Sequence, residues 1–137
     1  MKKFLISILI LIIVAVPVGI TIYHKAVTPT GLNYKQYKQG IKTYNLIKDY
    51  ESEKITKDEF KKRFYSYTKA LSGMKGGDEC WNHNELCRAF SEYERGFNMP
   101  DEPDSFRIEN GETIDDKKLT IDCAKGKIET ILNIGEE

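Results

Sequence analysis

The sequence has few of the side chains that enzymes use for covalent or metal-assisted chemistry. Its 137 residues include only two histidines, three cysteines and one tryptophan, and they form no glycine-rich phosphate loop and no HExxH segment. A thiol nucleophile needs a base beside it, and the chain offers only His83 and His24, the latter at the end of an apolar segment. We therefore expect a protein that is not an enzyme, needs no cofactor and has no nucleic-acid partner.

Near its N-terminus the chain contains a long segment without charged residues. No charged residue occurs from Phe4 to Tyr23, and 20 residues at about 1.5 Å each could cross a hydrocarbon layer of about 30 Å. Lys2 and Lys3 precede this run, as in exported proteins. We therefore expect residues 1–25 to form a signal anchor with a transmembrane helix, in a single-pass inner-membrane protein whose body lies in the periplasm. A cleaved secretory signal is the alternative.

The formal net charge of zero hides an uneven distribution of charge. Residues 25–75 contain 12 Lys and Arg against 5 Asp and Glu, whereas residues 76–137 contain 7 against 16. The basic half could lie against anionic lipid headgroups or an acidic protein partner. Solvated helix faces without a partner are the alternative.

After a linker over residues 26–33, apolar and aromatic residues recur at steps of three and four, which predicts an amphipathic helix. This stripe consists of Tyr34, Tyr37, Ile41, Tyr44 and Ile47, and a neighbouring face carries Lys35, Lys38 and Lys42. The stripe could form part of the core; alternatively, Tyr34, Tyr37 and Tyr44 could bind a partner together with the three lysines. Gly40 costs a helix about 1 kcal/mol relative to alanine, so either the helix is weaker there or another element packs closely.

Two more helices complete the predicted helical domain over residues 34–99. Thr56, followed three residues later by Glu59, forms a capping box that starts the second helix. The third helix should begin near Asn84 or Glu85 and end before Pro100, because proline cannot continue a helix.

The tail over residues 100–137 changes its hydrophobic period. Apolar residues alternate in "KLTIDC" and "KIETILNI", and the intervening "AKG" has glycine where a three-residue hairpin turn needs it. The stretch "SFRIENGETI" is a second candidate hairpin. The expected fold is therefore mainly α, a three-helix domain after an N-terminal transmembrane helix, with a small C-terminal antiparallel β-hairpin unit.

The cysteines have three possible pairings. Cys80 and Cys87 are seven residues apart, which on one straight helix would separate their Cα atoms by about 10 Å, beyond the reach of a disulfide. If they pair, the segment between them is a loop, with only Cys87 inside the third helix and Trp81 packed over the loop. Pairing of Cys123 with either of them, or with another chain, stays open. A zinc site built from Cys80, His83, Cys87 and Cys123 lacks the usual ligand spacing, so no metal is expected.

Three short motifs between residues 34 and 99 point to a family. They are "QGIKTY" at 39–44, "FYSY" at 64–67 and the Asp-Glu-Cys…Cys unit at 78–87. In these motifs the chain resembles the lysis-inhibition antiholins of T-even-like bacteriophages. The resemblance implies a periplasmic helical domain, closed by a disulfide, that binds the periplasmic part of the phage holin and delays lysis. It does not cover residues 100–137.

The expected function is therefore that of a membrane-tethered periplasmic binding protein, an antiholin-like regulator that contacts a holin through the first-helix stripe and its lysines. The alternative is a periplasmic inhibitor or immunity protein whose acidic half binds a basic cell-wall hydrolase or toxin. The acids considered for that role are Glu92, Glu94, Asp101 and Asp104. A structural envelope component is a third possibility.

Overall fold

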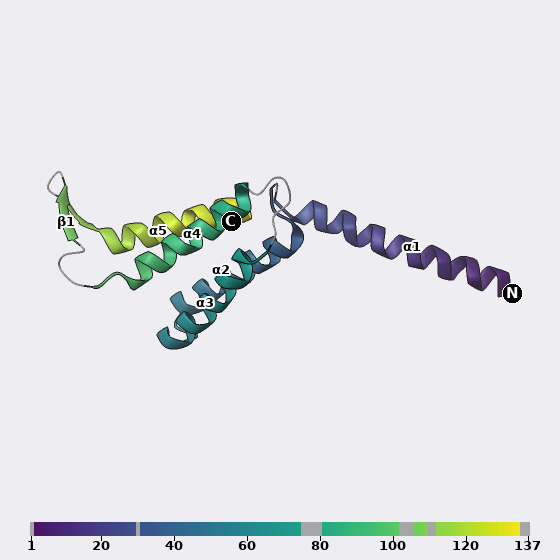
Figure 1. Ribbon diagram of the computed structural model, residues 1–137, viewed down its shortest axis with the longest axis horizontal. Coiled ribbons are helices and arrows are strands. Elements are labelled where there is room, and N and C mark those ends of the chain that lie inside the picture. Colours follow the sequence, from purple (N-terminus) through teal and green to yellow (C-terminus); the bar gives the residue numbers. More distant parts are fainter. Residues whose placement is uncertain (1, 30, 75–80, 102–105, 110–111, 135–137) are drawn as a thin grey trace.

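The computed structural model describes residues 2–29, 31–74, 81–101, 106–109 and 112–134. Within these ranges the chain forms five helices and two short strands (Figure 1). They are α1 (Lys2–Val27), α2 (Tyr34–Glu51), α3 (Lys57–Ser72), α4 (Trp81–Asn98), β1 (Phe106–Glu109), β2 (Glu112–Asp115) and α5 (Asp116–Leu132). Helices α2 and α3 form one hairpin and α4 and α5 a second, while α1 projects away from both (Figure 1).

Helix α1 exposes large apolar side chains over residues 12–23. They are 50–63% exposed, namely Ile12, Ile13, Val14, Val16, Val18, Ile20, Ile22 and Tyr23. Over the part of the chain that the structure describes, no helix has the length and apolar character needed to cross a membrane. The prediction of a transmembrane helix over residues 1–25 is therefore corrected.

Side-chain caps start the helices of the first hairpin. The Asn33 side chain accepts a hydrogen bond from the Gln36 backbone N–H at 3.0 Å, and the Gln36 side chain accepts one from the Asn33 N–H at 2.9 Å. Thr56 accepts a hydrogen bond from the Glu59 N–H at 3.3 Å and begins α3, as predicted. Each cap satisfies backbone donors that the first helical turn leaves without a partner.

An aromatic cluster joins the first hairpin to α4. Its centre is Phe60, which is 1% exposed. Its ring centroid lies 4.7 Å from that of Tyr50, 4.9 Å from Phe97, 5.1 Å from Phe64 and 6.3 Å from Tyr93. These stacked, tilted and edge-on contacts join side chains of three helices, so the cluster fixes α2, α3 and α4 relative to one another.

Close packing, rather than aromatic stacking, joins the second hairpin to α2. A Cβ atom added to Gly40 would lie 2.8 Å from the Leu132 Cδ2 atom and 3.0 Å from that of Leu86. At Gly40, α2 therefore contacts both α4 and α5. Of the two explanations offered for a glycine within this helix, the close packing of another element is the one that applies. Similarly, a Cβ on Gly96 would lie 3.0 Å from Ile121, so glycine lets α5 approach α4.

The predicted β hairpin over the segments "KLTIDC" and "KIETILNI" is wrong. Residues 116–132, which carry the alternating segments, form helix α5 with Ala124, Ile128 and Leu132 buried at steps of four. The helix begins at Asp115, whose side chain accepts a hydrogen bond from the Lys118 N–H, and ends at Asn133 in the left-handed conformation. In the described part of the tail, extended structure is confined to β1 and β2, which pair antiparallel before α5.

The third predicted helix also begins earlier than expected. Helix α4 already includes Trp81, so the stretch "WNHN" is helical rather than a loop. His83 explains the difference, because its buried ring lies 2.9 Å from the Leu71 carbonyl oxygen and thereby ties the first turn of α4 to the end of α3. Trp81 is 74% exposed and is not packed over a loop.

Candidate partner-binding surface

The structure places one histidine beside one cysteine. The His83 Nε2 atom lies 2.9 Å from the Leu71 carbonyl oxygen and 3.6 Å from the Cys87 Sγ atom. Because a carbonyl oxygen only accepts hydrogen bonds, Nε2 carries the ring proton and cannot take one from the thiol. Burial also raises the pKa of the Cys87 thiol. Both features disfavour the thiolate that nucleophilic catalysis uses.

The other cysteines add no reactive group to this pair. Cys87 is half-buried and Cys123 is exposed on α5, and neither is bonded to another cysteine among the described residues. Cys80 lies outside the described residues, so its disulfide with Cys87 stays a prediction. Among the residues with described positions, no three His, Cys, Asp or Glu side chains are grouped to hold a metal ion.

The tyrosines of the α2 stripe mainly serve packing. Tyr44 is buried, and its hydroxyl donates a hydrogen bond of 2.5 Å to the Glu129 carboxylate of α5. The Tyr34 ring stacks on the ring of His24 at the end of α1, with centroids 3.5 Å apart. Tyr37 is partly buried against the core. Of the three candidate tyrosines, Tyr34 and Tyr37 keep some exposed surface, whereas Tyr44 does not contribute to a binding surface.

The lysines of α2, by contrast, face solvent. Lys35, Lys38 and Lys42 are all exposed, and none of them forms an ion pair within the described parts of the chain. Helix α3 adds further exposed cations, namely Lys57, Lys61, Lys62 and Lys69. The first hairpin thus presents positive charge that its own carboxylates leave largely uncompensated.

Tyr67 of α3 is a surface residue that the sequence interpretation assigned only to an apolar stripe. The Lys42 Nζ atom lies 4.3 Å from its ring centroid, and Arg63 donates a hydrogen bond of 3.4 Å to its hydroxyl. This hydrogen bond, with the positive charges of Arg63 and Lys42, lowers the pKa of Tyr67. The spacing of Arg63 and Tyr67, one helical turn apart, was the signal that could have revealed the contact.

We call the surface formed by Lys35, Lys38, Lys42, Arg63 and Tyr67 the basic face. The Gln39 side chain helps to hold its two helices together, because it donates a hydrogen bond of 3.1 Å to the Tyr67 carbonyl oxygen. Cations beside an aromatic ring suit a partner that offers carboxylates next to apolar surface.

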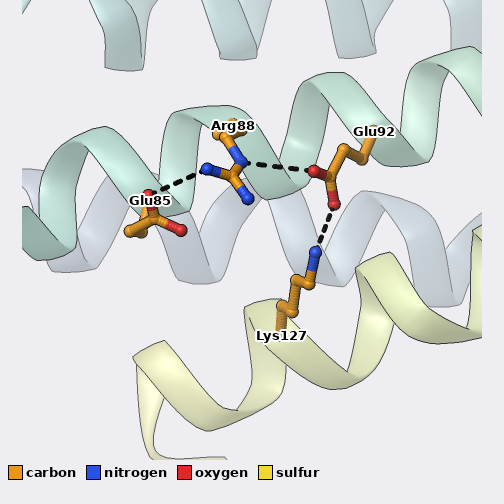
Figure 2. A network of polar contacts seen from close by, with 4 residues as sticks. All are labelled: Glu85, Arg88, Glu92 and Lys127. Carbon is orange, nitrogen blue, oxygen red and sulfur yellow. Dashed lines mark hydrogen bonds and ion pairs between the residues drawn. The ribbon is translucent and has the colours of Figure 1, made fainter.

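Two of the acidic residues considered for hydrolase binding form ion pairs within the chain. Glu92 accepts hydrogen bonds from Lys127 at 2.7 Å and from Arg88 at 3.2 Å (Figure 2), and the bond from Lys127 is the main reason why its pKa is lowered. Asp101 pairs with Lys117. Glu94 is partly buried, and Asp104 lies outside the described residues. Two of the four acids therefore already have cationic partners.

Comparison with known proteins identifies no relative, since no family model, no curated protein and no solved structure matches this chain. Its function must therefore be inferred from the surface chemistry and the sequence motifs.

Proposed function

We propose that the protein is a non-catalytic regulator of antiholin type. In this proposal the basic face binds an acidic surface on the periplasmic domain of a phage holin and delays host lysis. The observation that carries the binding mode is the exposure of Lys35, Lys38 and Lys42 without carboxylate partners among the described residues. Charges left uncompensated on one face steer an oppositely charged partner and accelerate association.

The choice of a holin rests on the motifs at 39–44, 64–67 and 78–87. The first of these lies on α2 and the second on α3, so both belong to the hairpin that carries the basic face. Periplasmic location is part of the same proposal and is supported by Lys2 and Lys3 ahead of an apolar segment, an arrangement typical of exported proteins.

Inhibition of a basic hydrolase is less well supported. Binding through Glu92 or Asp101 would first have to break their ion pairs with Lys127, Arg88 and Lys117. The basic face needs no comparable rearrangement, because Lys35 and Lys38 are already exposed.

Lysis timing in cells tests the proposal. The chain is co-expressed with the cognate holin, and we expect lysis to be delayed. The double substitution Lys35→Gln with Lys38→Gln should shorten the delay, because it removes two charges without disturbing the core. The matched control is Arg95→Gln with Lys118→Gln, which removes two exposed charges from the second hairpin and should leave the delay unchanged.

Two results would contradict the proposal. One is normal lysis timing in cells that contain the exported, folded wild-type protein. The other is an equal loss of the delay in both double variants, because this would show that overall charge matters rather than the basic face.

A further inference from the structure

The Tyr67 hydroxyl of α3 accepts a hydrogen bond but keeps its own proton for a further one. Arg63 donates to the hydroxyl oxygen from its Nη2 atom, 3.4 Å away. A guanidinium group can only donate, so this bond uses a lone pair of the phenol and leaves the O–H group as a donor. Among the residues that the structure describes, no acceptor receives that proton.

The charges around this hydroxyl leave one positive charge in excess. The Lys42 Nζ atom lies 4.3 Å from the Tyr67 ring centroid, and the Arg63 Cζ atom lies 5.8 Å from it. Glu59, one helical turn before Arg63, accepts a hydrogen bond of 3.1 Å from the Nη1 atom. One carboxylate therefore stands against two cations. The hydrogen bond from Arg63 and the two positive charges lower the pKa of Tyr67, which makes its O–H group a stronger donor.

A contact between the two helices holds these groups together. The Gln39 Nε2 atom of α2 donates a hydrogen bond of 3.1 Å to the Tyr67 carbonyl oxygen of α3. Gln39 and Lys42 are three residues apart and so lie on the same side of α2. The same contact that joins the helices thus keeps Lys42 beside Tyr67. Donors that are already in place lose little freedom when they bind a ligand.

We infer that Tyr67, Arg63 and Lys42 form a binding site for one carboxylate group. The carboxylate accepts a hydrogen bond from the Tyr67 O–H group and lies in the positive potential of the two cations. Its single negative charge matches the local excess, whereas a phosphate group, with nearly two negative charges at neutral pH, would exceed it. The inference rests on the proposed function, in which this carboxylate belongs to an Asp or Glu side chain of the holin's periplasmic domain.

Acetate tests the site without a holin. The full-length chain, with carbon-13 at the tyrosine Cζ atoms, is titrated with sodium acetate by NMR, and sodium chloride keeps the ionic strength constant. The signal of Tyr67 is assigned with Tyr67→Phe. We expect acetate to shift this signal saturably and to move the ionisation of Tyr67 to higher pH, because a carboxylate binds the protonated phenol and is repelled by the phenolate.

Tyr65, on the same helix, is the internal control. It also has a cation beside its ring, since the Lys69 Nζ atom lies 5.9 Å from the ring centroid. Within the described parts of the chain, however, no arginine donates to its hydroxyl. Acetate should therefore leave the Tyr65 signal unchanged.

Substitutions of the cations identify the groups that bind acetate. Arg63→Gln and Lys42→Gln should each raise the acetate dissociation constant at least about threefold, as expected for contacts between exposed charges. Lys69→Gln is the matched control and should leave this constant unchanged. Lys42 and Lys69 are exposed, and the Arg63 side chain is 40% exposed, so all three variants should fold, which circular dichroism checks.

Tyr67→Phe connects the site to the partner, because it removes the hydroxyl and keeps the ring. It should raise the dissociation constant for the holin's periplasmic domain at least about threefold. The inference is overturned if acetate leaves the Tyr67 signal unchanged, if it shifts Tyr65 and Tyr67 equally, or if Arg63→Gln binds acetate like the wild type. It is also overturned if Tyr67→Phe binds the holin domain like the wild type.

These failures are distinguishable from failure of the proposed function. Holin binding that depends on Lys35 and Lys38 but not on Tyr67 would support the antiholin proposal and overturn only the carboxylate site. Acetate binding at Tyr67 in a folded protein that binds no holin would contradict the antiholin proposal and support the carboxylate site.

Discussion

The two helical hairpins of this protein differ in how their surface charges are used. Both contribute large aromatic side chains to the core, but the α2–α3 hairpin leaves Lys35, Lys38 and Lys42 exposed. The α4–α5 hairpin packs closely through Gly96 and Ala124, and the ion pair between Glu92 and Lys127 joins its two helices. Side chains that form ion pairs within a chain can add stability, but their charges are already neutralised. Charged side chains without such pairs can bind oppositely charged groups of a partner. The comparison therefore supports the proposal that the first hairpin binds the partner.

The contact between the hairpins explains how both can belong to one body. Tyr44 of α2 donates a hydrogen bond to Glu129 of α5, and Lys125 of α5 pairs with Glu51 of α2 at 2.7 Å. The hairpins also pack closely at Gly40, against Leu86 and Leu132. The basic face is consequently carried on a supported hairpin, which reduces the ordering that binding would require.

The largest expected effect comes from removing the centre of the aromatic cluster. Phe60→Ala should lower the free energy of unfolding by about 3–5 kcal/mol, because it deletes a buried ring and leaves a cavity among four aromatic neighbours. Urea denaturation followed by circular dichroism measures the change. Tyr65→Ala, on the exposed side of the same helix, is the control and should stay within about 0.5 kcal/mol of the wild type.

A smaller loss is expected where the two hairpins meet. Gly40→Val should cost about 1–3 kcal/mol in urea denaturation, because the new side chain overlaps the buried Leu86 and Leu132. Gly73→Val places the same side chain at an exposed helix end with ordinary φ and should change stability by less than about 0.5 kcal/mol. Equal stability of the two variants would refute the close contact at Gly40.

The smallest effect concerns the paired charges of the second hairpin. Glu92→Gln should cost less than about 1 kcal/mol at neutral pH, as is usual for surface ion pairs. Hydrogen bonds from Lys127 and Arg88 lower the pKa of Glu92, so its contribution is present above the ordinary glutamate pKa and is lost as pH falls through the lowered value.

This pH dependence is measured by comparing wild-type and Glu92→Gln stability across the acidic range, with Glu85→Gln as the control. Glu85 contacts only one member of the network, Arg88, at 3.4 Å, so its replacement should cost less. If the difference in stability between the wild type and Glu92→Gln stays constant from neutral to acidic pH, the ion pairs of Glu92 are not its cause.

Local signals predicted the first hairpin well. The capping pattern of Thr56 and Glu59 determines where α3 begins without help from the rest of the fold. The exposure of Lys35, Lys38 and Lys42 likewise follows from the amphipathic period of α2. The role of Tyr44 could not be predicted from local signals, because its partner Glu129 lies 85 residues further along the chain.

The second hairpin was misread because its sequence fits two periods at once. Leu119, Ile121 and Cys123 alternate as in a strand, yet Ile121, Ala124 and Ile128 also recur at the steps of three and four that a helix requires. Packing against α4 decides between the two periods, through the space that Gly96 leaves for Ile121. Such a tertiary contact carries no local signal, although Asp115 as an N-cap residue was a clue to the helix start.

The most direct test of the proposed function measures the binding itself. The purified full-length chain is titrated with the purified periplasmic domain of the cognate holin in a calorimeter, at low and at high salt. The account predicts saturable binding that weakens with salt and with Lys35→Gln plus Lys38→Gln, but not with Arg95→Gln plus Lys118→Gln. Binding that is insensitive to salt and to both substitutions, or no binding by the folded protein, would contradict it.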